Sequence, residues 1–273
     1  PAEAVAAGAT SNDILHGEDG DDSLYGGAGQ DELHGGPGND YLESGGATGG
    51  FDQVNNTYSF FETDFLFGGP GNDTLVATGG DVVMVGGAGN DMISSDDNAE
   101  TWFDFIRVNY QSSPAGIVVT MDGSNLTVED GFGGTDTVSR VHVLGDSPFN
   151  DTITIDSNYQ TSFGNFIGVR LGAGDDVVTF VGVAQARIGY QGAGGAVLID
   201  LEDGTATDLN ASDNFIGFDQ FFGTVHVARG TSFDDELYGS SGDEAFRGQG
   251  GDDLIDGRAG VDAIQFAGSE TGV

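Results

Sequence analysis

Cysteine and lysine are both absent from this 273-residue chain, and its only strongly basic side chains are seven arginines. Without cysteine the chain forms neither a disulfide framework nor a thiolate metal site. The arginines stand singly in the sequence and form no basic stripe, which argues against a nucleic acid partner and against an anionic membrane surface. No stretch approaches the apolar length that a membrane span requires, so we expect no span.

Acidic residues and glycine take the place of these missing types. The chain has 45 aspartates and glutamates and 49 glycines, and its formal net charge is -38. Its hydrophobic fraction of 37% is too high for a simple acidic disordered tail. A folded form therefore needs something that neutralises the carboxylates, and divalent cations are the simplest candidate.

Nine-residue units recur in phase near both ends of the chain. Four units from GATSNDILH to GGPGNDYLE fill residues 8–43, and four from GTSFDDELY to GRAGVDAIQ fill residues 230–265. Between the blocks, GGPGNDTLV from Gly68 and GGAGNDMIS from Gly86 flank a degenerate unit, ATGGDVVMV. Each unit predicts a glycine-rich turn, an acidic sixth residue and a short strand, and two units predict one coil of a solenoid.

The sixth residue of each unit is the candidate metal ligand. Glycine turns allow positive φ angles and let backbone carbonyls face a cation, and the carboxylate supplies the charge. Every ligand offered is a hard oxygen on a flexible turn, which favours calcium over zinc, copper and magnesium. The candidate ligands are Asp13, Asp22, Asp31, Asp40, Asp73, Asp91, Asp151, Asp176, Asp235, Glu244, Asp253 and Asp262.

The eighth residue of each unit is the candidate core position. Stacked coils would place these side chains in apolar ladders inside the solenoid. Solvated glycine-aspartate turns alone would not keep a nine-residue register. The expected core residues are Leu15, Leu24, Leu33, Leu42, Leu75, Ile93, Leu237, Phe246, Ile255 and Ile264.

These GGxGxDxUx units resemble the repeats-in-toxin (RTX) family of calcium-binding nonapeptides. The resemblance implies an all-β, right-handed parallel β-roll or β-helix solenoid, with each calcium ion between turns of neighbouring coils and about five or more ions in all. It implies a fragment of a large bacterial secreted or surface protein. The ligand pairs that it implies are Asp13 with Asp31, Asp22 with Asp40, Asp73 with Asp91, Asp235 with Asp253, and Glu244 with Asp262.

Several units depart from the family pattern. GATSNDILH and GTSFDDELY lack the fourth-place glycine, Glu244 replaces aspartate, and Val82 stands where the acid of its unit belongs. We expect these half-sites to be weak or empty. The chain starts without methionine or a signal peptide, and its last residues resemble the start of a further long repeat, so we expect an excised piece of a larger array.

The middle of the chain has a different repeat. We expect residues 1–96 to be an N-terminal RTX roll with an insertion at 44–67, residues 97–229 to be irregular parallel coils, and residues 230–273 to be a C-terminal roll. Two long units of roughly eighty residues make up the middle, where RVNYQSSPAGIVVTMD from Arg107 matches RIGYQGAGGAVLIDLE from Arg187. Arginine, tyrosine and histidine recur at matching places in the two units. A structural ladder would produce this recurrence, and a polysaccharide-acting site is the alternative interpretation.

Three functions are compatible with these patterns. No zinc-protease helix, nucleophile elbow or phosphate loop occurs, so we expect no enzyme. The first function is a calcium-binding, non-catalytic module of a secreted, type I-like protein that folds on external calcium at an extracellular or cell-surface location. The alternatives are a self-associating adhesin stalk or surface-layer subunit, and a polysaccharide-acting or glycan-contacting module.

Overall fold

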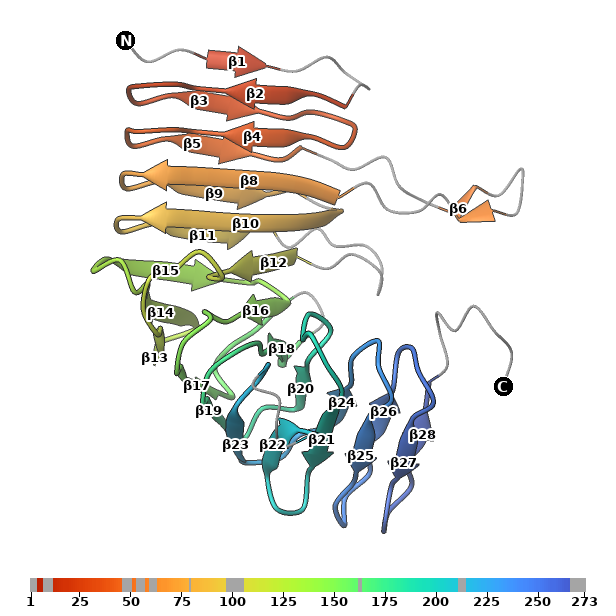
Figure 1. Cartoon of the computed structure of the whole chain (residues 1–273). Helices are drawn as coiled ribbons and strands as arrows, with labels where there is room; N and C mark the ends of the chain where they lie inside the picture. The colour runs from red at the N-terminus through yellow and green to blue at the C-terminus, as the bar shows by residue number, and fades with distance from the viewer. Residues whose placement is uncertain are drawn as a thin grey trace.

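The computed structural model shows an all-β solenoid (Figure 1). The structure describes residues 4–6, 12–45, 51–52, 57–58, 63–78, 80–96, 106–161, 164–210 and 215–265. None of these residues forms a helix, so the described part of the chain has no helix that could cross a membrane. This architecture confirms the all-β fold class.

Two long sheets form the walls of the solenoid. The 15-stranded sheet contains, in spatial order, β1 (Ala4–Ala6), β3 (Ser23–Tyr25), β5 (Tyr41–Glu43), β9 (Thr74–Ala77), β11 (Met92–Ser95), β15 (Thr135–Ser139), β14 (Asn125–Glu129), β13 (Val118–Asp122), β17 (Thr152–Asp156), β19 (Val177–Val181), β23 (Phe218–Phe222), β22 (Thr205–Asp208), β21 (Val197–Asp200), β25 (Glu236–Tyr238) and β27 (Leu254–Asp256).

The second wall is parallel throughout. This 11-stranded sheet contains, in spatial order, β2 (Ile14–His16), β4 (Glu32–His34), β8 (Thr63–Pro70), β10 (Asp81–Ala88), β12 (Ile106–Asn109), β16 (Val143–Gly145), β18 (Phe166–Arg170), β20 (Gln185–Gly189), β24 (Val227–Arg229), β26 (Ala245–Arg247) and β28 (Ala263–Ile264). A separate pair, β6 (Phe51–Asp52) and β7 (Thr57–Tyr58), lies away from both walls within the expected insertion at 44–67 (Figure 1).

Two nonapeptides make one coil, as the sequence predicts. Strands alternate between the walls, and parallel partners are eighteen residues apart, as in Leu15 opposite Leu33 and Leu24 opposite Leu42. Because side chains of a strand alternate between its two faces, this register turns the eighth residue of each unit towards the inside of the coil. In the regular coils, the glycine-rich turns of successive coils therefore lie directly next to one another on each side of the solenoid.

The middle of the chain interrupts this pattern on one wall only. In the 15-stranded sheet, β13, β14 and β15 form an antiparallel meander, and β21, β22 and β23 form a second one. The other wall stays parallel from β2 to β28. The stack changes direction across this middle part, so that β24 to β28 do not continue the line of the first coils (Figure 1).

The core lies between the walls and contains the expected ladder. Leu15 and Ile255 are only partly buried beside it. The prediction of Ile264 as a core residue is wrong, because this side chain is 47% exposed on β28, the last described strand of its wall. Burial is almost complete for the others, namely Leu24, Leu33, Leu42, Leu75, Ile93, Leu237 and Phe246.

Candidate metal centre

The sixth-place carboxylates stack into a ladder that runs from coil to coil. The backbone N–H of Asp22 donates to Oδ1 of Asp40 at 2.8 Å, that of Asp40 to Asp73 at 2.7 Å, and that of Asp73 to Asp91 at 2.8 Å. Each carboxylate thus joins its own turn to the turn before it. All four aspartates are buried, although they carry like charges.

The other predicted pairs are brought together in the same way. The backbone N–H of Asp13 lies 2.9 Å from Oδ1 of Asp31, and that of Asp235 lies 3.0 Å from Oδ1 of Asp253. Glu244 approaches Asp262 through the same bond at 3.1 Å. Every pair that the resemblance implied is therefore adjacent in space.

The second oxygen of each carboxylate has a different environment. Oδ2 of Asp40, Asp73, Asp91 and Asp176 is buried and has no hydrogen-bond partner among the described residues. In the same arrangement, a Cβ built on Gly26, the first residue of its unit, would lie 2.8 Å from Oδ2 of Asp31. Only glycine leaves the space next to this oxygen open.

Backbone carbonyls of the turns complete a set of oxygen donors. The second glycine of a unit has a positive φ, which is +101° at Gly36 and +110° at Gly69, and L side chains rarely adopt this conformation. Turns of neighbouring coils lie in direct contact, since the N–H of Gly38 donates to the carbonyl of Pro70 at 3.0 Å. Buried carboxylate oxygens beside stacked turn carbonyls fit the all-oxygen shell of calcium.

The protein environment raises the pKa of two carboxyls of the ladder, Asp73 and Asp91. Burial is the main cause, and it raises the pKa of Asp73 to about 7 and that of Asp91 to about 6. Backbone hydrogen bonds oppose the rise, and neighbouring carboxylates add to it. Without a cation, Asp73 and Asp91 would therefore take up protons as the pH falls through about 7 and about 6.

The ladder continues through the middle of the chain on aspartates that the nonapeptide pattern missed. The N–H of Asp91 donates to Oδ1 of Asp136 at 2.9 Å, and the N–H of Asp176 donates to Oδ1 of Asp219 at 2.9 Å. The predicted ligands Asp151 and Asp176 are joined in the same way at 2.8 Å. The missed aspartates lie in GTDTV and GFDQF, which keep the glycine-x-aspartate-x-hydrophobic half of the repeat.

Asp64 is a further aspartate that the nonapeptide pattern missed. It lies in the second carboxylate ladder, which also contains Asp13 and Asp31. We call each position of a ladder a rung. Oδ1 of Asp64 accepts the backbone N–H of Asp31 at 2.8 Å. The sequence TDFL around it keeps only the aspartate and the hydrophobic residue two places later. Without the preceding glycines, this segment does not match the nonapeptide pattern.

Three carboxylates gather most closely in the middle. Oxygen atoms of Asp146, Asp151 and Asp176 all lie within 4.8 Å of one another, and all three residues are buried. Burial and the nearby charges of Asp219 and Asp146 raise the pKa of Asp176 to about 10. Asp146 was not a predicted ligand, because it occupies the first place of the unit DSPFNDTIT, where the repeat has glycine.

The second side of the solenoid lacks a carboxylate in its middle coils. Val82 is in register with Asp64, so a buried valine occupies the rung that the sequence marked as lacking its acid. Further along, Nδ1 of His142 lies 3.2 Å from the backbone N–H of Ile106, and Nδ1 of His226 lies 3.2 Å from that of Ala186. These imidazoles accept the hydrogen bond that a carboxylate accepts elsewhere.

Comparison with known proteins agrees with this geometry. A family model described as RTX calcium-binding nonapeptide repeat (4 copies) matches residues 8–42, 67–99 and 229–264. No curated protein matches the chain. The matched segments carry the stacked glycine turns and most of the carboxylate ladder, and RTX repeats of this kind bind calcium and form parallel β-rolls. The chain therefore carries RTX calcium-binding nonapeptide repeats in these three segments.

Proposed function

We propose that this chain is a non-catalytic, calcium-binding β-roll module of a secreted protein, and that it folds when external calcium fills the carboxylate ladders. The observation that carries the proposal is the set of buried Oδ2 atoms on Asp40, Asp73, Asp91 and Asp176, which meet no donor among the described residues. A buried acceptor without a partner is costly. Calcium would satisfy each of these oxygens together with the turn carbonyls.

The ladders offer several sites. Five adjacent pairs of sixth-place acids support five or more ions, held by the twelve carboxylates predicted from the sequence, with Asp64, Asp136, Asp146 and Asp219 as additional ligands. With a dissociation constant of about 0.1 mM and about 1 mM calcium, one site contributes roughly 1.4 kcal/mol. Five such sites contribute about 7 kcal/mol, which is comparable to the total stability of a domain.

The charge of the chain explains why folding would wait for calcium. At a net charge of -38, the calcium-free chain repels itself, and the coils force the carboxylates close together. Intracellular calcium is too dilute to fill weak sites, whereas external calcium is not, so an unfolded chain would be exported and would fold outside the cell. The net charge and the weak sites together support an extracellular or cell-surface location.

The recurring tyrosines and histidines support a non-catalytic role. Tyr110 and Tyr190 are buried and donate to Asp136 and Asp219, and His142 accepts a backbone N–H in the core. These side chains hold the coils in register, which is what a structural ladder requires. Their repetition in both long units follows from the repeated fold.

Circular dichroism with calcium, with magnesium and with excess EGTA tests the proposal. We expect a β-rich spectrum only with calcium, because magnesium requires a stricter octahedral shell. Isothermal titration would then count five or more ions. A β-rich spectrum that persists in excess EGTA would contradict the proposal.

A matched pair of variants locates the binding. Asp73→Asn keeps Oδ1, which accepts the N–H of Asp40, and removes the charge from the partnerless Oδ2. Asp122→Asn makes the same chemical change at an exposed position at the end of β13. We expect Asp73→Asn to raise the calcium concentration at half-folding several-fold, while Asp122→Asn leaves it unchanged. Equal effects of the two variants would remove the assignment of the ladder as the calcium site.

A further inference from the structure

Five of the seven arginines gather on the outer face of the parallel wall. The sequence scatters them singly, and the fold brings them together. They line one cavity of about 240 Å³, in which Asp81 is the one acidic residue among the lining residues that the structure describes. The five are Arg107, Arg170, Arg187, Arg229 and Arg247.

The strand register explains how the fold assembles this cluster. Arg107, Val143, Gly168 and Arg187 stand side by side on successive strands of the 11-stranded sheet. Two residues further along the same strands, a second row contains Gly145, Arg170, Gly189, Arg229 and Arg247. The residues between the rows point into the core, so both rows share the outer face.

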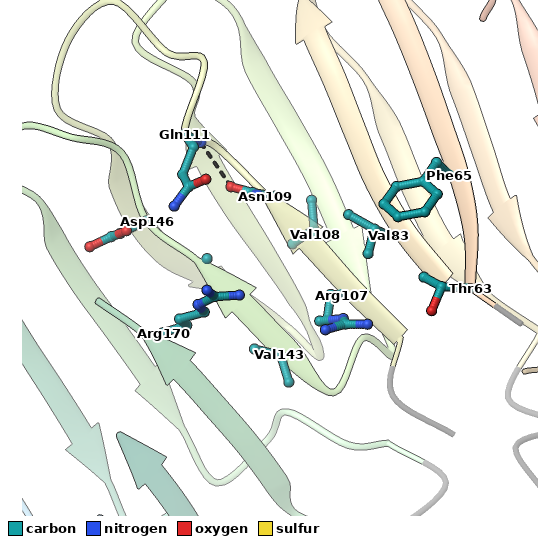
Figure 2. A pocket seen from close by; sticks show the side chains of 11 residues that line it. Thr63, Phe65, Val83, Arg107, Val108, Asn109, Gln111, Val143, Asp146 and Arg170 are labelled. Carbon is teal, nitrogen blue, oxygen red and sulfur yellow. Dashed lines mark hydrogen bonds between the residues drawn. The ribbon is translucent and has the colours of Figure 1, made fainter. Parts of the chain in front are cut away.

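A second pocket continues the first one. It has a volume of about 290 Å³ and shares Arg107, Val143 and Arg170 with the arginine-lined cavity. Figure 2 shows these three residues together with Asn109 and Gln111, whose backbone N–H donates to Oδ1 of Asn109 at 2.9 Å. We call the two adjoining pockets the arginine groove.

Glycines on the strands make room for these long side chains. Gly168 has no positive φ, yet a Cβ built on it would lie 2.5 Å from a guanidinium nitrogen of Arg187. The Arg187 guanidinium also lies 5.2 Å from the centre of the Phe166 ring, and its side chain is almost completely buried. Glycine inside a strand weakens it, and it is found where another group must approach the backbone. The floor of the groove is therefore shaped around the arginines.

The positive charge of the groove is poorly neutralised by the protein itself. Arg107 pairs with Asp81 at 2.6 Å, whereas Arg170, Arg229 and Arg247 form no ion pair with a carboxylate of the described residues. Nε of Arg229 is buried without a hydrogen-bond partner. Burial and the charge of Arg247 lower the pKa of Arg229 to about 10. Asp81 and Asp146 are the two carboxylates among the described residues that line the groove, against five arginines.

We propose that the arginine groove binds a segment of a linear acidic oligosaccharide, with uronate carboxylates on the second row, at Arg170, Arg229 and Arg247. Guanidinium groups bind carboxylates with two parallel hydrogen bonds, and bound anions would relieve the mutual repulsion of the arginines. Strands lie about 4.8 Å apart, so Arg170 and Arg229, two strands from each other, suit charges that recur about 10 Å apart along a chain.

The uncharged lining favours a sugar over a phosphate polymer or a peptide. Side-chain amides of Asn109, Gln111, Gln191 and Gln249 line the groove, and an amide both donates to and accepts from hydroxyl groups. Phe65 adds an aromatic surface at one end, on which the C–H face of a sugar ring can pack. A nucleic acid would extend far beyond the groove, where the net negative charge of the chain repels it.

Titration calorimetry with hexagalacturonate in saturating calcium tests this inference. We expect binding that weakens as sodium chloride is added, and no binding of the fully methyl-esterified hexamer, which keeps the sugar and lacks the charge. Hexa-aspartate, which keeps the charge and lacks the hydroxyls, should bind about tenfold more weakly or not at all. Absence of hexagalacturonate binding would overturn the inference, and so would equally tight binding of the ester or of hexa-aspartate.

Variants place the binding in the groove. Arg229→Gln combined with Arg247→Gln should weaken hexagalacturonate binding about tenfold or more. Arg140→Gln removes the same charge from the other wall, where Arg140 lines a different pocket, and should have no effect.

Calcium-dependent circular dichroism shows whether each variant folds, which separates this test from the proposed calcium function. If the double variant does not fold, Arg247→Gln alone serves, because Arg247 is only half-buried. Unchanged affinity in a folded groove variant would overturn the inference.

Discussion

The hydroxyl of Tyr190 donates a hydrogen bond to Oδ2 of Asp219 at 2.6 Å, in the interior of the solenoid. Tyr110 makes the equivalent bond to Asp136 at 2.9 Å in the first long unit. In both units the tyrosine follows a strand of the parallel wall and the aspartate belongs to the third strand of a meander. Each bond therefore ties the two walls together at the place where a meander replaces a simple coil.

Replacing Tyr190 with phenylalanine should destabilise the fold. The substitution leaves Oδ2 of Asp219 without its donor in a fully buried position, which costs about 1–3 kcal/mol of the free energy of unfolding. Urea denaturation in saturating calcium measures the loss. Tyr238→Phe is the control, since its hydroxyl donates to Glu236 on the outer face of β25, and its cost should stay below about 0.5 kcal/mol. Equal losses of stability in the two variants would contradict this role of the Tyr190 hydroxyl.

The regular coils could be predicted from the sequence because each nonapeptide carries its whole signal locally. Glycine, aspartate and leucine recur every nine residues, so the turn, the rung and the core position of Asp22, Leu24 and their repeats follow without long-range information. The ligand pairs came from the family resemblance, and they lie on strands of one wall that are eighteen residues apart in the regular coils. The prediction of the first and last coils rests on this short period.

The middle of the chain could not be predicted to the same extent. Asp91 and Asp136 are neighbouring rungs although 45 residues separate them, because a strand of the other wall and a meander lie between them. Because the coils of the middle part differ in length, equivalent residues no longer recur at multiples of nine. The arginine groove could not be predicted for the same reason, since Arg107 and Arg247 meet only through the register of six strands, from β12 to β26.

Acidification should partly replace calcium as a folding trigger. Folding raises the pKa of four ladder carboxyls from 3.8 to about 6 at Asp91 and to about 7 at Asp73, Asp136 and Asp219, chiefly through burial. A raised folded-state pKa stabilises the calcium-free fold fully below about pH 3.8, and this contribution is lost as the pH rises through about 7. His142 acts in the opposite direction, because burial lowers its pKa from 6.5 to about 4, so its contribution is lost as the pH falls.

Four carboxyls outweigh one imidazole, so the net effect should follow the carboxyls. In excess EGTA, circular dichroism should show more β structure near pH 5 than at pH 8. With calcium present the dependence should reverse, because calcium displaces protons from the same oxygens and binds more tightly at pH 8. A calcium-free spectrum that does not change between these pH values would contradict the raised pKa of the ladder.

The second glycine of a turn should be more sensitive to substitution than a glycine in an ordinary hairpin. Gly36 and Gly123 both have a positive φ, of +101° and +63°, so alanine strains the backbone at either position. A Cβ at Gly123 meets nothing within 4 Å, whereas a Cβ at Gly36 collides with the carbonyl oxygen of Glu18 in the neighbouring turn. We therefore expect Gly123→Ala to cost about 1–2 kcal/mol of stability and Gly36→Ala to cost more.

Calcium titration separates the two causes of this loss. Gly36→Ala should also raise the calcium concentration at half-folding, because pushing the turns of Gly36 and Glu18 apart moves the carbonyls that face the ion. Gly123→Ala should change stability without changing calcium affinity per site, since it lies in the turn between β13 and β14, outside the stacked nonapeptide turns. The two variants are compared after each calcium concentration at half-folding is corrected for the loss of stability. Equal corrected values would mean that contact between the turns does not set the calcium affinity. A higher midpoint for Gly36→Ala alone would tie calcium binding to the close stacking that glycine permits.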